Sequence, residues 1–119
     1  MAQVLIVDDS PTEVHILSSI LEKGGYTVLT AANGEDGIAQ AKAAMPDLIL
    51  MDVVMPGMNG FQATRQLTKD PATANIPIII VTTKDQETDR VWGLRQGAKD
   101  YITKPIEEAA LLEKIKALL

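Results

Sequence analysis

Carboxylic acids stand directly after two apolar segments of strand length. Asp8 and Asp9 follow Val4–Val7, and Asp52 follows Leu48–Met51. Parallel strands that end at one edge of a sheet would bring these side chains together, where they would repel one another and raise one another's pKa values. A hard divalent cation with oxygen ligands relieves such repulsion, and Mg²⁺ commonly sits on one or two carboxylates. The pattern predicts a Mg²⁺ site at Asp8, Asp9 and Asp52.

A hydroxyl and an ammonium follow two further apolar segments. Thr82 ends the fourth segment along the chain, and Lys104 comes just after the fifth. Mg²⁺ and a lysine together suit a planar phosphoryl group in transfer, with an aspartate as the nucleophile that becomes an aspartyl phosphate. A plainer interpretation is that Asp8 and Thr82 only cap the helices that follow. It does not account for Asp52, which caps no nearby helix.

The elements that would position these residues alternate between strands and helices. Five short segments are rich in Val and Ile and are mostly continuous in hydrophobicity, which is typical of parallel strands buried on both faces. They are Val4–Val7, Thr27–Ala31, Leu48–Met51, Ile78–Val81 and Tyr101-Ile102. A helical segment follows each, so the chain is predicted to be an α/β fold, a doubly wound five-stranded parallel sheet with helices on both faces.

Capping residues predict where the helices begin and end. Ser10-Pro11-Thr12-Glu13 reads as a capping box with proline in the first turn, and Gly24-Gly25 ends that helix. Further helices are expected over 33–44, 60–68 and 85–96, and from Glu107 onward. In the fourth helix, Val91 and Leu94 are expected to face the core, with Trp92 half-buried on its flank.

Composition narrows the function classes. The chain has 119 residues, about one domain, and no cysteine, so disulfides, cysteine nucleophiles and cysteine-based zinc sites are excluded. A net charge of −5 disfavours nucleic-acid binding. The apolar runs are far shorter than a membrane span and no signal peptide is seen, so we expect a cytoplasmic protein without a membrane partner. The only histidine, His15, is expected to be exposed on the first helix.

The ordered set of motifs resembles a known family. It consists of Asp8-Asp9, the stretch MDVVMPGMNG around Asp52, VTT at Thr82, and YITKP at Lys104. This set is similar to the receiver domain of two-component response regulators, over essentially residues 1–119. That resemblance implies a (βα)5 flavodoxin-like fold with strand order 2-1-3-4-5. The stretches GFQATRQL and VTTKDQETD look closer still to the PilH-like single-domain receivers of type IV pilus twitching motility.

The resemblance also implies roles for the acidic residues. Asp52 matches the phosphoacceptor. Asp9 and Asp52 match direct Mg²⁺ ligands, Asp8 matches an acidic partner that often acts through water, and Val54 would offer its backbone carbonyl to the metal. Lys84 and Val54 stand where many relatives carry polar or acidic residues, so we predict a fairly long-lived aspartyl phosphate.

The remaining implied roles concern switching and partners. Lys104 matches the lysine that contacts the phosphoryl oxygens, Thr82 the switch hydroxyl and Tyr101 the switch aromatic. A cis peptide between Lys104 and Pro105 is common in the family. The phosphoryl donor would be a histidine kinase or a His-phosphotransfer domain. The output would be a protein contact on the face of the fourth helix, fifth strand and fifth helix, by a protein that we expect to be a monomer and not an enzyme.

Three alternatives stay open at the level of sequence. A Mg²⁺-dependent aspartyl-phosphate phosphatase would carry a second aspartate two residues after Asp8, where this chain has Ser10. A receiver-like interaction module that never takes phosphate would be favoured by an incomplete acidic set. The chain could also be a receiver cut from a longer regulator.

Overall fold

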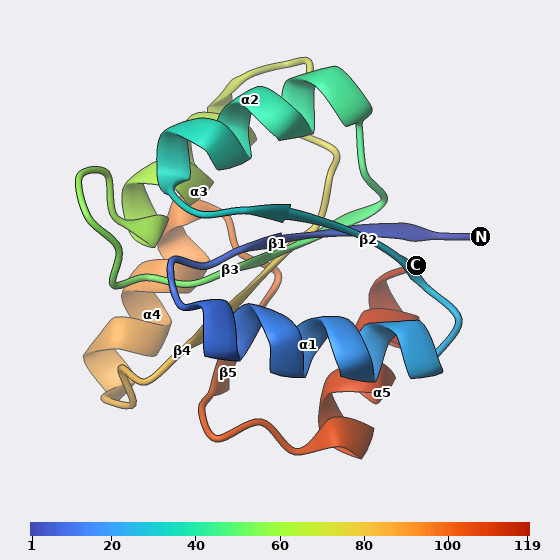
Figure 1. The fold of residues 1–119 in the computed structure, drawn as a ribbon. Helices are drawn as coiled ribbons and strands as arrows, with labels where there is room; N and C mark the ends of the chain where they lie inside the picture. Colours follow the sequence, from blue (N-terminus) through green and yellow to red (C-terminus); the bar gives the residue numbers. More distant parts are fainter.

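Five parallel strands form one sheet in the order β2-β1-β3-β4-β5 in the computed structural model, which describes residues 1–119 (Figure 1). The predicted fold class and strand order are confirmed. The strands are β1 (Gln3–Val7), β2 (Thr27–Ala31), β3 (Leu48–Met51), β4 (Ile78–Thr82) and β5 (Asp100–Thr103). Because β1 and β3 are neighbours and Val7 pairs with Met51, the residues that follow both strands meet at one edge.

Helices cover both faces of this sheet. In Figure 1, α1 and α5 lie on one face and α2 and α3 on the other, with α4 beside α3. The helices are α1 (Pro11–Lys23), α2 (Gly34–Ala44), α3 (Gly60–Lys69), α4 (Glu87–Gln96) and α5 (Glu108–Leu118). No helix is both long enough and apolar enough to cross a membrane.

The continuous hydrophobicity of the central strands β1, β3 and β4 has a direct cause in this layering, whereas the edge strands β2 and β5 are only partly buried. Successive strand residues point to opposite faces. In β1, Val4 and Ile6 pack with α1 and α5, whereas Leu5 and Val7 pack with α2 and α3. Both sets are fully buried. A strand covered on both sides has no solvent-facing position, so no alternation of polar residues is needed.

The helix starts follow the predicted N-cap residues, but the capping box predicted at Ser10 and Glu13 is only half formed, because the Ser10 N–H donates to Asp8 instead of to Glu13. The Ser10 hydroxyl accepts a hydrogen bond from the Glu13 backbone N–H at 3.3 Å, and Pro11 opens α1. The Asn33 side chain likewise accepts from the Asp36 N–H at 2.8 Å. These bonds satisfy backbone donors that have no partner within the helix.

The predicted core face of α4 is wrong at Val91, which is 40% exposed, and Leu94 is only partly buried, whereas Gly93 and Gln96 are buried. Trp92 is 50% exposed, in agreement with the half-buried position predicted for it. The reason for the outward position of Val91 is close packing at Gly93, where a Cβ atom would lie 2.8 Å from the Cδ1 of Ile80. A glycine lets this helix approach β4 closely and turns the larger apolar side chains outward. The helix also begins at Glu87, two residues later than predicted.

Candidate functional site

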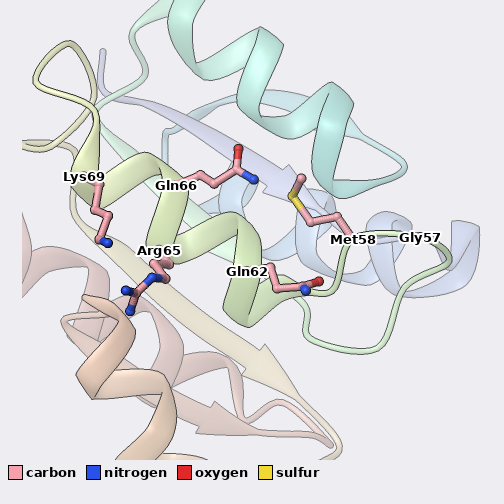
Figure 2. A pocket seen from close by; sticks show the side chains of 6 residues that line it. All are labelled: Gly57, Met58, Gln62, Arg65, Gln66 and Lys69. Atoms are coloured by element: carbon pink, nitrogen blue, oxygen red, sulfur yellow. The ribbon is translucent and has the colours of Figure 1, made fainter.

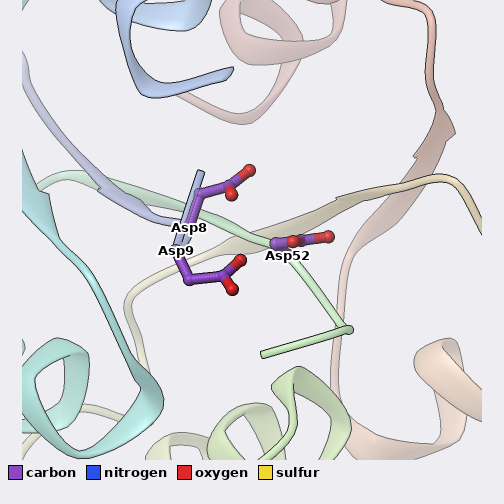
Figure 3. Close-up of side chains that lie close together, drawn as sticks. All are labelled: Asp8, Asp9 and Asp52. Carbon is purple, nitrogen blue, oxygen red and sulfur yellow. The ribbon is translucent and has the colours of Figure 1, made fainter. Parts of the chain in front are cut away.

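Three carboxylates meet at the carboxyl edge of the sheet. Single oxygen atoms of Asp8, Asp9 and Asp52 all lie within 4.8 Å of one another. Figure 3 shows Asp8 and Asp9 on consecutive residues after β1, with Asp52 beside them at the end of β3 and all three side chains extending the same way. The predicted grouping is therefore present.

The three carboxylates differ in burial. Asp8 is 2% exposed and Asp52 is 8% exposed, whereas Asp9 is exposed. Asp8 accepts a hydrogen bond from the backbone N–H of Ser10 at 2.9 Å. The Oδ1 atom of Asp52 accepts one from the N–H of Val53, also at 2.9 Å. Asp9 is thus the one of the three carboxylates that solvent reaches freely.

Charge is incompletely balanced at Asp52. Burial and the neighbouring Asp8 charge raise the pKa of Asp52 to about 6, although Lys104 and the Val53 N–H act in the opposite direction. A raised carboxyl pKa means that negative charge is costly at this position. A cluster of hard oxygen donors with excess negative charge fits Mg²⁺.

Lys104 is the one cation of the site. Its Nζ donates a hydrogen bond to Asp8 Oδ2 at 2.9 Å and lies 3.7 Å from Asp52 Oδ1. Burial alone lowers the pKa of Lys104, but the hydrogen bond to Asp8 and the surrounding carboxylates together hold that pKa above its usual value. The peptide between Lys104 and Pro105 is cis, as expected.

Sequence reasoning missed a fourth carboxylate. Glu13, in the first turn of α1, places its Oε2 atom 3.8 Å from the Nζ of Lys104. The sequence pattern assigns this residue to helix capping alone. The signal that could have found it is its place in the first turn of the helix that directly follows Asp8 and Asp9, which begins at the same edge of the sheet.

The expected switch residues are connected through one backbone segment. Thr82 is fully buried at the end of β4, and its hydroxyl accepts from the Lys84 N–H at 3.4 Å. The hydroxyl of Tyr101 donates to the Lys84 carbonyl at 2.7 Å. Burial and the charge of Asp89 raise the pKa of Tyr101 to about 12, so this phenol stays protonated as a donor.

The two positions expected to influence hydrolysis lie at the surface. Val54 is 60% exposed, and the Lys84 ammonium lies 3.9 Å from a carboxylate oxygen of Asp89. Behind Val54, the chain folds back so tightly that a Cβ atom on Gly60 would collide with the Asp52 carbonyl oxygen. Only glycine at this position lets the start of α3 pack directly against the backbone of Asp52, and this close approach closes the loop that contains Val54. His15 is exposed, as predicted.

The largest surface hollow lies elsewhere. A hollow of about 590 Å³ lies along α3, and none of its lining side chains, which Figure 2 labels, belongs to the acidic cluster. It is lined by Gly57, Met58, Gln62, Arg65, Gln66 and Lys69. The acidic cluster therefore lies outside this hollow.

Comparisons with known proteins agree with this geometry. The family model described as response regulator receiver domain matches residues 4–116. The protein PilH of Pseudomonas aeruginosa is 66% identical over 119 residues, covering 100% of this chain and 98% of PilH. The chemotaxis protein CheY4 of Vibrio cholerae has a TM-score of 0.93 at 34% identity, covering 100% of this chain and 99% of the other.

A further solved structure bears on the acidic cluster. The receiver domain of the sensor histidine kinase PA1611 from Pseudomonas aeruginosa was solved with a magnesium ion coordinated in its active site cleft. It has a TM-score of 0.91 at 30% identity and covers 98% of this chain and 96% of the other.

Proposed function

The chain belongs to the response regulator receiver family, and from this premise we propose that it is a phosphorylation switch whose phosphoacceptor is Asp52. One observation carries the proposal: Asp52 shares the edge of the sheet with Asp8, Asp9 and the ammonium of Lys104. A nucleophile, a set of metal ligands and a cation for phosphoryl oxygens thus stand together. The 66% identity to PilH supports a role in type IV pilus twitching motility.

The nucleophile in this proposal is a carboxylate oxygen of Asp52. Oδ1 accepts the hydrogen bond of the Val53 N–H, which leaves Oδ2 for attack on phosphorus. In transfer from a phosphohistidine, the new oxygen–phosphorus bond forms as the nitrogen–phosphorus bond breaks. The bonding electrons remain on the imidazole nitrogen. With the pKa of Asp52 at about 6, this carboxylate is largely ionised at neutral pH, as attack requires.

The surrounding residues would orient the group. Lys104 would shift an N–H from Asp8 toward a phosphoryl oxygen, since it already lies 3.7 Å from Asp52. Thr82 would turn its hydroxyl to the same group, giving up its bond to the Lys84 N–H. Asp9 and Asp52, with Asp8 and the Val54 carbonyl, would hold Mg²⁺. The bound metal would neutralise charge that develops on the phosphoryl oxygens.

The partners follow from this role. A histidine kinase or His-phosphotransfer domain would be the donor, and a protein would read the α4–β5–α5 face, because Tyr101 of β5 contacts the Lys84 segment that precedes α4. The protein would act in the cytoplasm as a monomer. It would assist its own phosphorylation and dephosphorylation and would not turn over a separate substrate.

A phosphotransfer assay tests the proposal. The wild-type protein, incubated with Mg²⁺ and a labelled phosphodonor, should gain acid-labile label, and Asp52→Asn should gain none. Asp47→Asn is a matched control, since Asp47 lies at the opposite end of β3. Undiminished labelling of Asp52→Asn would overturn the assignment.

Metal binding is tested separately at Asp9. Asp9→Ala should weaken Mg²⁺ binding, measured by calorimetry, because it removes an exposed carboxylate ligand. The metal-free variant should be at least as stable as wild type, since one repulsive charge is lost. A Mg²⁺ titration that Asp9→Ala leaves unchanged would contradict the proposed ligand set.

A further inference from the structure

Glu13 has no hydrogen-bonding role that explains its side chain. Its backbone N–H is the group that the Ser10 hydroxyl caps, and its carboxylate caps nothing in return. The ion pair with Lys104, at 3.8 Å, is the one that this carboxylate makes. The side chain is 30% exposed, so it lies between solvent and the buried end of Lys104.

Three carboxylates therefore surround the ammonium group of Lys104. Its Nζ lies 3.7 Å from Asp52 Oδ1 and 3.8 Å from Glu13 Oε2, while Asp8 holds it at 2.9 Å. A phosphoryl group on Asp52 would need one of the three N–H donors of this ammonium. Asp8 already accepts one of these N–H groups, and the negative charge of Glu13, 3.8 Å away, offsets part of the positive charge that would attract an anionic donor.

We propose that Glu13 is a specificity-determining residue for the phosphodonor: its carboxylate draws on the Lys104 ammonium and repels small anionic donors, which slows their reaction with Asp52. This inference rests on the proposed function of Asp52 as phosphoacceptor. A protein donor that places a cationic side chain opposite Glu13 escapes the penalty, whereas a free anion cannot. The residue thus protects the switch from phosphorylation by small metabolites.

The charge of the donor provides the decisive test. Acetyl phosphate is a dianion at neutral pH and phosphoramidate is a monoanion, so a repelling carboxylate slows the first more than the second. Glu13→Gln, which keeps the size of the side chain and removes its charge, should raise the rate constant for acetyl phosphate about five-fold and that for phosphoramidate about two-fold. The increase in rate should come mainly from a lower KM for the donor. Because added salt screens charge, the increase should become smaller at higher ionic strength.

Two variants separate this effect from a structural one. Glu22→Gln makes the same charge change on the exposed side of α1, near its other end, and should leave both rates unchanged. Glu13→Asp keeps the negative charge of the wild-type residue. It should therefore discriminate between the two donors as wild type does, unlike Glu13→Gln. Equilibrium Mg²⁺ binding, measured by calorimetry, should weaken by no more than about two-fold in Glu13→Gln, since this carboxylate is a distant charge and not a ligand.

The outcomes are distinct. Equal acceleration for both donors, or a salt-independent effect, would overturn the inference, as would rates for Glu13→Gln that match those of Glu22→Gln. Each of these results would leave the proposed function standing. A wild-type protein that is labelled at Asp52 neither by these two donors nor by a phosphorylated histidine kinase or His-phosphotransfer domain would overturn both.

Discussion

The hydroxyl of Tyr101 donates a 2.7 Å hydrogen bond to the backbone carbonyl of Lys84. The N–H of the same Lys84 donates to the Thr82 hydroxyl at 3.4 Å. The loop after β4 is therefore held between a residue of β5 and the residue expected to contact a phosphoryl group. If the Thr82 hydroxyl turns toward Asp52, it no longer accepts the hydrogen bond of the Lys84 N–H. The Lys84 backbone can then move, and with it the hydrogen bond that its carbonyl accepts from Tyr101.

Gly93 controls the packing of this tyrosine. A Cβ atom at Gly93 would lie 2.8 Å from Ile80 Cδ1 and 3.1 Å from Tyr101 Cδ2. Overpacking of this kind costs about 1–3 kcal/mol, which exceeds the roughly 1 kcal/mol that alanine gains over glycine in a helix. Gly93→Ala should therefore lower the free energy of unfolding, measured in urea by the fluorescence of the single tryptophan, Trp92. Thr88→Ala, on the exposed side of α4, is the control. An increase in stability for Gly93→Ala would contradict the packing.

Asp52 should make stability depend on pH in metal-free buffer. Its pKa is about 6 in the folded protein, against an ordinary value of 3.8 for an aspartate. Between these values the folded state holds more protons than the unfolded state, so the free energy of unfolding falls as pH rises from about 4 to 6. Asp52→Asn removes this loss. The variant should match wild type near pH 4 and exceed it by about 2 kcal/mol at pH 7, where the difference levels off.

Chemical denaturation at a series of pH values, with a chelator present, checks this expectation. Asp85→Asn, a change of the same type on an exposed loop residue, serves as the control. A stability difference for Asp52→Asn that stays constant between pH 4 and 7 would be inconsistent with the raised pKa.

Lys104 should matter for folding as well as for signalling. Its side chain is 9% exposed and that of Asp8 is 2% exposed. Removing one partner of a buried pair leaves the other charge unbalanced, at a cost of about 3 kcal/mol. Lys104→Ala should keep the wild-type circular dichroism spectrum but lose roughly this free energy of unfolding in metal-free buffer. Saturating Mg²⁺ should restore part of the loss, because it supplies the missing positive charge.

Lys114→Ala is the matched control for this prediction. Lys114 pairs with Asp100 at the same 2.9 Å distance, but the two side chains are 41% and 26% exposed. An exposed pair contributes about 1 kcal/mol or less. Equal losses in the two variants would mean that burial does not set the strength of the Lys104 pair.

The lifetime of the aspartyl phosphate should depend on Val54 and Lys84. Val54 is exposed beside the site and offers no hydrogen bond to an attacking water. Lys84 carries donors only and is directed toward Asp89. Val54→Asn combined with Lys84→Glu would offer groups that position water, worth about 1–2 kcal/mol, so dephosphorylation should accelerate roughly ten-fold.

The decay of labelled protein after removal of the donor measures this rate, with Mg²⁺ present and partner proteins absent. Lys99→Glu, a charge reversal on an exposed residue before β5, controls for the change in net charge. A double variant that decays at the parental rate would show that water placement at these positions does not limit hydrolysis.

Much of this architecture follows from local sequence. The central strands β1, β3 and β4 could be predicted because residues buried on both faces must all be apolar, and Ser10 and Asn33 cap helices through bonds within one turn. Asp8, Asp52 and Lys104 could be assigned to one edge because parallel strands share a carboxyl end.

Other relationships depended on the packing of distant segments. Lys104 bonds to Asp8 more closely than to Asp52, and Glu13 approaches the same ammonium, because side chains from α1 and the loop after β5 converge there. The core face of α4 was likewise decided by the approach of Gly93 to β4 and β5, against its own hydrophobic pattern. Periodicity describes one element at a time, whereas these contacts depend on how closely two elements can approach, and that distance exists only once the chain has folded.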